Sequence, residues 1–123
     1  MNENSGFRGN PHHLSLLNDA VQKKDISLWN SYVRRNGSSF RAKLAGAELS
    51  HQNLSEVSLD GADLTDAVLV NTNLKRANLN NARLRGCDLT EADLTAARLN
   101  HTDLTNAVLV RACLSGIHGR GAL

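Results

Sequence analysis

The sequence predicts an all-β solenoid with a short helical segment in front of it. Leucine recurs at every fifth position without exception from Leu44 to Leu114, and the residue two places before each leucine is almost always small. A five-residue spacing would scatter leucines around an α-helix and place them on alternating faces of a flat strand. The chain must therefore turn within every unit, so that each leucine enters one shared core and the coils stack.

The composition indicates a single domain without a strong charge bias. The chain has 123 residues, of which 41% are hydrophobic, and a formal net charge of +2. Residues 40–115 contain eight Lys or Arg and nine Asp or Glu, so the repeated part is close to neutral. A nucleic-acid-binding protein would be expected to concentrate basic residues on one surface. The sequence therefore argues against nucleic acid as a partner.

Four segments can be distinguished along the chain. Residues 1–10 contain Asn, Gly and Ser and are expected to be disordered, whereas residues 11–37 show apolar residues at helical spacing. Residues 38–117 hold the repeats, and residues 118–123 form a short C-terminal tail.

The segment 11–37 is predicted to form two short helices that cap the solenoid. Helices of this length are unstable alone, and the bare end of a repeat stack must be covered. The predicted cap residues are Leu14, Leu17, Val21, Ile26, Trp29 and Val33. The alternative is that Trp29 and Tyr32 form an exposed docking surface for a partner, since aromatic residues anchor interfaces.

The repeats match a known pattern, most closely at Ala62-Asp63-Leu64, Ala77-Asn78-Leu79 and Ala92-Asp93-Leu94. Over about residues 40–117 the chain resembles the pentapeptide-repeat family, whose consensus is A-(D/N)-L-X-X. The pair Trp29-Asn30 is similar to one in the helical segment that precedes the repeats in many bacterial members. The resemblance implies a right-handed quadrilateral β-helix with four pentapeptides in each coil, which gives about 3.75 coils here.

With four units in a coil, residues twenty apart would lie above one another at about 4.8 Å. On the first face the residue before each leucine alternates in charge, which predicts a structural ladder of opposite charges that should pair. The members of this ladder are Lys43, Asp63, Arg83 and Asp103. On the fourth face Asp60, Asn80 and Asn100 form a row in which side-chain amides can bond along the rod.

The second face carries the candidate partner surface. Four valines flank its leucines and point outward, in two pairs separated by two coils. These residues are Val68, Val70, Val108 and Val110. Contiguous exposed apolar surface indicates an interaction site. The alternative is purely structural, because valine favours strands and isolated surface valines need no function.

The leucine register stops at the C-terminal end, where Gly119 takes the next leucine position. The end of the last coil then needs cover, because unpaired strand edges and apolar ends are sites of association. Two arrangements supply it: the tail folds over the end, or a second copy of the chain covers it in a homodimer.

The sequence contains no recognisable catalytic, cofactor-binding or metal-binding site. His51 and His101 fall on different faces and cannot share a metal ion, and no nucleophile is paired with a base. Cys87 takes an inward position and Cys113 an outward one, so we expect free thiols. Free thiols, together with the lack of a signal peptide or a bilayer-length apolar run, favour a cytoplasmic protein.

These observations favour a non-catalytic scaffold for protein–protein interaction, with a protein partner that the sequence does not identify. The family resemblance raises one alternative, a DNA-mimicking modulator or protector of DNA gyrase or a related topoisomerase. That activity goes with a long, strongly acidic, dimeric rod. The repeats of this chain are nearly neutral and the rod is short, so we favour the scaffold.

Overall fold

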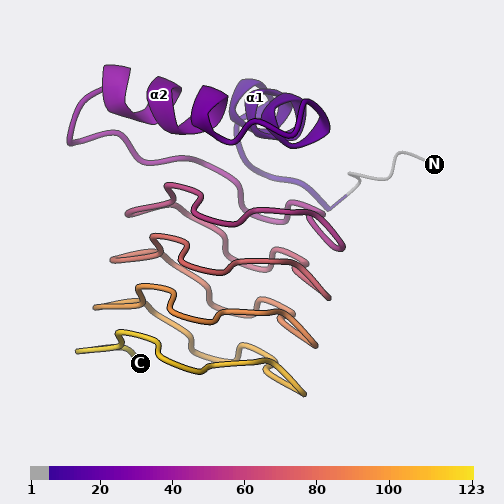
Figure 1. The fold of residues 1–123 in the computed structure, drawn as a ribbon, viewed down its shortest axis with the longest axis vertical. Coiled ribbons are helices and arrows are strands. Elements are labelled where there is room, and N and C mark those ends of the chain that lie inside the picture. Colours follow the sequence, from indigo (N-terminus) through magenta and orange to yellow (C-terminus); the bar gives the residue numbers. More distant parts are fainter. Residues whose placement is uncertain (1–5) are drawn as a thin grey trace.

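The chain forms a short rod of stacked coils with two helices across its upper end (Figure 1). The structure is a computed structural model, and it describes residues 6–123. The coils follow one another down the rod, and the C-terminus lies in the last coil at the lower end (Figure 1). The two ends of the rod therefore differ: one lies under the helices and the other has no element beneath it.

Residues twenty apart pair through parallel β-bridges, so each turn of the coil takes twenty residues. Lys43 pairs with Asp63 and Asp63 with Arg83, and equivalent bridges form columns along the whole stack. These are single-residue bridges, because a turn interrupts the chain in every five-residue unit. The four faces of the coil are numbered here by their first leucines, which are Leu44, Leu49, Leu54 and Leu59 in that order.

A tight turn follows every leucine. In the first one the N–H of Ala47 donates to the carbonyl of Leu44 at 3.0 Å, and Gly46 between them has a φ of +74°. The residue two places after each leucine has a positive φ throughout the stack, although most of these residues are not glycine. The repeat as a whole therefore holds each corner in the left-handed conformation, which costs a non-glycine residue about 1–2 kcal/mol.

The interior is a column of leucines lined by small side chains. All leucines of the repeats from Leu44 to Leu99 are at most 2% exposed. At the small position, the side-chain oxygen of Gln52 is buried without a partner among the described residues. The threonines do have partners: the hydroxyl of buried Thr72 donates to the carbonyl of Leu49 at 2.9 Å, and that of Thr102 likewise donates to a leucine carbonyl at 2.7 Å. Such bonds allow a polar group to be buried at little cost.

The upper end is covered by helix α1, Pro11–Gln22, and helix α2, Ser27–Arg35. Asn10 begins α1, because its side chain accepts hydrogen bonds from two backbone N–H groups of the first turn. Asp25 accepts a hydrogen bond from the N–H of Ser27 at 3.1 Å, just before the first turn of α2. Neither of these described helices has the length and apolarity required to cross a membrane.

The underside of the helices is apolar. Three of the predicted cap residues, Leu14, Leu17 and Trp29, are buried, and the other three, Val21, Ile26 and Val33, pack against the same core while partly exposed. Tyr32 does not stand free as a docking residue. Its ring lies 5.8 Å from that of Trp29 and 5.6 Å from that of Phe40, measured between centroids.

Helix α2 is also fastened to the first coil by hydrogen bonds. The indole N–H of Trp29 donates to the carbonyl of Ser58 at 2.9 Å. The side chain of Asn30 accepts from the N–H of Ser58 at 2.8 Å and donates to the carbonyl of Glu56 at 3.1 Å. These backbone groups belong to the first coil and have no coil above them. Trp29 and Asn30 supply the partners that a further coil would have supplied.

The segment 6–10 covers another part of the same edge. The backbone N–H of Asn10 donates to the carbonyl of Lys43 at 2.8 Å. The prediction that residues 1–10 are disordered is therefore wrong for residues 6–10, because this segment pairs with a coil edge that is otherwise unoccupied. Residues 1–5 lie outside the described residues.

We predict that Asn30→Ala lowers the free energy of unfolding by about 1–3 kcal/mol, because it leaves two backbone groups of the first coil without partners. Chemical denaturation followed by circular dichroism measures the change. Asn18→Ala is the matched control, because the side-chain oxygen of Asn18 is buried without a hydrogen-bond partner among the described residues. Since alanine is also the better helix former, this control should be neutral or slightly stabilising. Equal destabilisation by both changes would contradict the assigned role of Asn30.

We predict that the stability of the fold depends on pH through the protonation of His13. Its Nδ1 accepts a hydrogen bond from the N–H of Lys43 at 3.0 Å, and burial, assisted by His12 and Lys43, lowers its pKa from the ordinary 6.5. The unfolded chain therefore binds a proton at a higher pH than the folded chain does. Stability should fall as the pH drops through 6.5, and the loss should level off below the folded pKa.

The measurement is the free energy of unfolding across this pH range. His13→Asn keeps an acceptor at the same place but cannot take up the proton, so its stability should depend less on pH. His51→Asn, at an exposed turn of the repeats, is the control and should retain the wild-type dependence. If His13→Asn leaves the slope unchanged, another group causes it.

Candidate interaction surface

The structure places the four predicted valines on face 2, two in the column before the leucines and two in the column after them. Their exposed fractions differ. Val68 and Val70 are half-buried, whereas Val108 is 43% and Val110 is 50% exposed. The parallel bridges run from Val68 to Asp88 and from Asp88 to Val108, so one polar coil separates the upper pair from the lower pair. The four valines are thus two separate pairs rather than a continuous band.

The polar coil between the pairs is well satisfied by its own hydrogen bonds. One carboxylate oxygen of Asp88 accepts from the backbone N–H of Thr90 at 3.0 Å and from its hydroxyl at 2.6 Å. These bonds lower the pKa of Asp88 below its usual value. A carboxylate that stays charged keeps water at this point, so the upper valines contribute little to an apolar surface at the lower end.

The lower valines continue into an apolar surface at the end of the rod. Leu109 lies between them and is only partly buried, and Leu114 is 39% exposed. The equivalent leucines in the coils above are almost completely buried. We call the lower valines and the neighbouring apolar residues of the last coil the coil-end surface, which consists of Leu104, Val108, Leu109, Val110, Leu114 and Ile117.

The C-terminal tail does not fold over this surface. Its backbone follows the path of the coil: Leu123 donates to the carbonyl of Thr102 at 2.9 Å and accepts from the N–H of Leu104 at 2.8 Å. The side chain of Leu123 is 79% exposed. The tail therefore covers only the part of the lower edge that runs from Leu99 to Leu104, and it leaves the edge at Leu109 and Leu114 open.

The last coil also presents backbone groups that have no partner within the described chain. In every coil above, the N–H of each leucine and of the residue two places after it donates to the next coil. At the lower edge the corresponding N–H groups have no acceptor among residues 6–123. They belong to Asn106, Leu109, Arg111, Leu114 and Gly116. Apolar side chains and unpaired donors therefore occur together at this end.

The charged column of face 1 is stacked as predicted but is not paired as predicted. Its four members, Lys43, Asp63, Arg83 and Asp103, are joined by consecutive parallel bridges. No ion pair forms between them among the described residues. Asp63 instead accepts from the N–H and hydroxyl of Thr65. Asp103 instead forms an ion pair with Arg85 at 3.2 Å. Arg85 directly follows Leu84, and its side chain extends to the next coil.

The row of face 4 likewise bonds in a different way from the one expected. The side-chain oxygen of Asn80 accepts from the backbone N–H of Asn100 at 3.0 Å, and that of Asn100 accepts from the N–H of Arg120 at 2.9 Å. Asp60 at the top of the row accepts from the side chain of Asn81 at 3.1 Å. The amide oxygens therefore bond to the backbone of the next coil rather than to neighbouring amides.

Comparison with known proteins identifies the repeats. A family model described as pentapeptide repeats matches the chain in eight copies, over residues 42–81, 53–90 and 87–118. The chain belongs to the pentapeptide-repeat family. Proteins of this family fold as right-handed quadrilateral β-helices and are generally structural or interaction proteins rather than enzymes. No curated protein matches the chain significantly.

Three solved pentapeptide-repeat structures are similar to this chain. HetL, involved in heterocyst differentiation regulation in Nostoc sp. strain PCC 7120, is 32% identical over 62% of this chain and 42% of its own, with a TM-score of 0.32. A protein from the cyanobacterium Cyanothece 51142 is 32% identical over 63% of this chain and 60% of its own, with a TM-score of 0.31.

The third is a protein from the thylakoid lumen of Arabidopsis thaliana, 25% identical over 63% of this chain and 55% of its own, with a TM-score of 0.31. The chain thus spans about half the length of the solved structures that it matches.

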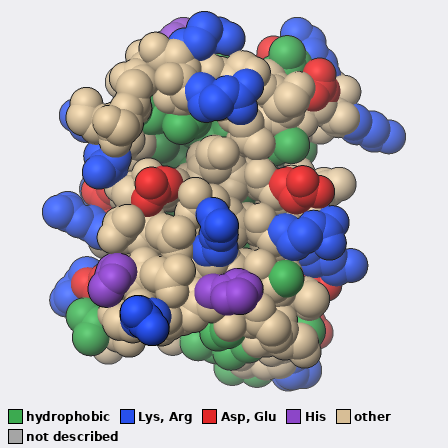
Figure 2. Space-filling view, turned by 60° about the vertical axis from the view of Figure 1, so that its left-hand side comes forward, with side chains coloured by type: hydrophobic (Ala, Val, Ile, Leu, Met, Phe, Trp, Pro, Cys, Tyr) green, Lys and Arg blue, Asp and Glu red, His purple; other side chains and the backbone are tan. Residues whose placement is uncertain are grey.

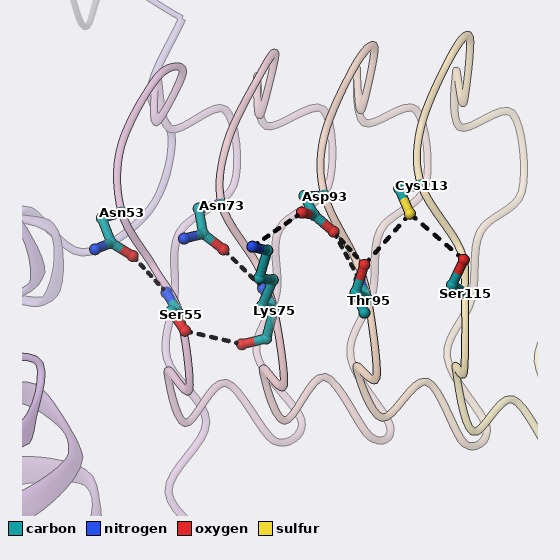
Figure 3. Close-up of polar contacts among 8 residues, drawn as sticks. All are labelled: Asn53, Ser55, Asn73, Lys75, Asp93, Thr95, Cys113 and Ser115. Carbon is teal, nitrogen blue, oxygen red and sulfur yellow. Dashed lines mark hydrogen bonds and ion pairs between the residues drawn. The ribbon is translucent and has the colours of Figure 1, made fainter.

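The structure of this pentapeptide-repeat chain explains why Asp or Asn so often precedes the leucine. On face 3 the side chains of Asn53, Asn73 and Asp93 each accept a hydrogen bond from the backbone N–H two residues later (Figure 3). Thr95 adds its hydroxyl to the bond with Asp93. The carboxylate or amide thus closes each short segment before the turn, a local arrangement that Asp and Asn form readily.

Cys113 ends this column of face 3 and differs from the other cysteine. Its sulfur is exposed, lies 3.3 Å from the hydroxyl of Thr95, and donates to Ser115 (Figure 3). As a thiolate the sulfur accepts hydrogen bonds from the hydroxyl of Thr95 and from the backbone and side chain of Ser115, which lowers its pKa. The thiol of Cys87 is buried and donates to the carbonyl of Leu64 at 2.8 Å, and burial raises its pKa to about 12. Both cysteines are free.

Within residues 6–123 the structure brings together no group of three or more His, Cys, Asp or Glu side chains that could hold a metal ion. Sequence reasoning missed a different group: Arg98, His118 and Arg120 line one hollow on face 4 with Asn80 and Asn100. The signal was present, because His118 follows Arg98 by twenty residues and Arg120 follows Asn100 by twenty. It lay partly in the segment treated as a tail.

We predict that a thiol reagent modifies Cys113 rapidly in the native protein and reaches Cys87 only after unfolding, because the thiolate is the reactive form and must be accessible. Titration with a chromogenic disulfide should show one reactive thiol in buffer and two in denaturant. Cys113→Ser should leave the native protein unreactive. Thr95→Val, which removes the hydroxyl beside the sulfur, should slow the reaction of Cys113. Equal reactivity of both thiols in buffer would contradict the burial of Cys87.

Proposed function

We propose that this pentapeptide-repeat chain is a non-catalytic interaction scaffold that associates with a second copy of itself through the coil-end surface. The observation that carries the proposal is the coincidence, at one end of the rod, of exposed apolar side chains with unpaired backbone donors. Each of these features alone is common on protein surfaces. Together they are the features of an unprotected sheet edge.

Burial of the coil-end surface would be favourable. Val108, Val110 and Leu114 are among the few large apolar side chains that are strongly exposed in the described chain. Complete burial of such a side chain contributes about 1.5–3 kcal/mol. The backbone donors beside them can bond to carbonyl groups of a facing coil. Backbone hydrogen bonds between successive coils make the rod rigid, so little conformational entropy is lost on contact.

The difference between the two ends supports a closed dimer. At the upper end α1, α2 and residues 6–10 occupy the edge, and Trp29 and Asn30 bond to its backbone groups. At the lower end of the described chain the edge of faces 2 and 3 is free, and strongly exposed apolar side chains lie beside it. Two copies that meet through the same surface use up both free edges, so growth stops at two copies.

A non-catalytic role agrees with how the polar side chains are used. Thr95 and Thr90 donate to neighbouring carboxylates, and Cys87 donates to a backbone carbonyl inside the core. These groups stabilise the coil, and among residues 6–123 they are engaged in bonds of this kind rather than set beside a free base. The free thiols also support our expectation of a reducing compartment such as the cytoplasm.

Sedimentation equilibrium of the full chain over a range of concentrations tests the proposal. We expect a monomer–dimer equilibrium. Val108→Thr combined with Val110→Thr should weaken it by about tenfold in Kd, because two apolar groups are replaced by hydroxyls of the same shape. Leu114→Lys should weaken it further, since it places like charges opposite each other in the contact.

The matched control is Val68→Thr combined with Val70→Thr, which makes the same replacements on the same face two coils higher. This variant should dimerise like the wild type. A wild-type chain that stays monomeric at every concentration would overturn the proposal, as would an equal effect of the upper and lower valine variants. Thermal unfolding of each variant separates loss of association from loss of the fold.

A further inference from the structure

Face 4 carries a cluster of basic side chains over the lower coils. Arg98, His118 and Arg120 surround an open hollow of about 540 Å³, together with Asn80 and Asn100. Figure 2 shows this side of the rod, with basic and histidine side chains gathered over the centre of its lower half and acidic side chains higher up or at the margins. The near-neutral charge of the repeats therefore conceals a local excess of positive charge.

The two arginines of this cluster lack the partners that most other basic side chains of the repeats have. Four ion pairs lie within the repeats, and they join Lys75 to Asp93, Arg76 to Glu56, Arg85 to Asp103 and Arg111 to Glu91. Among the described residues, neither Arg98 nor Arg120 has a carboxylate partner or a side-chain hydrogen bond. Both residues are exposed.

The asparagines of the cluster add further donors rather than acceptors. The side-chain oxygens of Asn80 and Asn100 already accept backbone N–H groups from the coil below. Their side-chain NH₂ groups have no acceptor among the described residues and remain available. The one acidic residue of the row, Asp60, lies in the coil above Asn80 and accepts a hydrogen bond from Asn81. The hollow therefore offers donors and positive charge without a competing carboxylate.

We infer that this hollow binds a phosphate group, carried by a phosphorylated side chain or free in solution. Guanidinium groups bind phosphate and carboxylate oxygens through paired N–H donors. A phosphate monoester carries nearly two negative charges at neutral pH and three free acceptor oxygens. It matches two arginines on adjacent coils, about 4.8 Å apart along the rod, together with the amide donors of Asn100 beside Arg98 and Asn80 one coil above. A single carboxylate has one charge and two oxygens, so it would leave about half of these arginine and amide donors unused.

This inference is independent of the proposed dimer. The residues that line the hollow lie on face 4, whereas the coil-end surface is formed by face 2 and the open edge of the last coil. The test of the dimer substitutes Val108, Val110 and Leu114, and the test of the hollow substitutes Arg98 and Arg120 on another face, so failure of either proposal is recognisable without reference to the other.

Two-dimensional NMR of the full chain, titrated with inorganic phosphate and with a short phosphoserine peptide, tests the inference. We expect saturable shifts of the amide signals of face 4 and none with the same peptide carrying serine. Tighter binding of the peptide assigns the site to a phosphorylated side chain, and tighter binding of the inorganic ion assigns it to free phosphate. Either outcome supports the inference.

Arg98→Gln combined with Arg120→Gln should weaken binding by at least about tenfold, since each removes a charge-assisted pair of hydrogen bonds. Arg76→Gln combined with Arg111→Gln removes the same charge from paired arginines at other positions and should keep the wild-type affinity. Thermal unfolding confirms that both variants are folded. Shifts that do not saturate, or an equal loss in both variants, would overturn the inference and leave only general charge attraction.

Discussion

The whole rod depends on the left-handed conformation of the residue two places after each leucine. This residue turns the chain through a corner, and four such corners bring it back above its starting point after twenty residues. Every other feature is a consequence of this return. The leucines meet on one axis, the backbone groups of successive coils come within hydrogen-bond distance, and side chains twenty apart become neighbours. Most of the corner residues are not glycine, so the hydrogen bonds between coils must outweigh the local cost.

Because the interior is uniform, the differences between parts of the molecule lie on its outside and at its ends. Face 3 is occupied by side chains that bond to their own segment, as Asp93 does with Thr95. Face 4 carries basic side chains that have no partner among the described residues, and the strongly exposed valines of face 2 lie in the last coil. The upper edge is occupied by Trp29, Asn30 and residues 6–10, whereas the lower edge is open. A repeat that is almost invariant inside can therefore support two unrelated surfaces.

The sequence predicted what depends on the register and missed what depends on where individual side chains reach. The five-residue leucine spacing was enough to predict which residues stack, and the bridge from Lys43 to Asp63 confirms that stacking. It was not enough to predict ion pairs, because Asp63 can bond to Thr65 within its own segment and Arg85 can reach Asp103 from a neighbouring position. The pairing of Asn10 with Lys43 joins segments that share no pattern, so no periodicity could have indicated it. The path of the tail decides whether Arg120 joins Arg98, and this too was visible only in three dimensions.

The helices across the upper end have a consequence for the order in which the molecule is made. Within this chain α1 and α2 precede the repeats and are synthesised before them, and the first coil completes the edge by packing against them. Each later coil then meets a completed edge immediately behind it and needs only a twenty-residue excursion to reach its partners. Assembly by this route advances in one direction, from the helices toward the last coil.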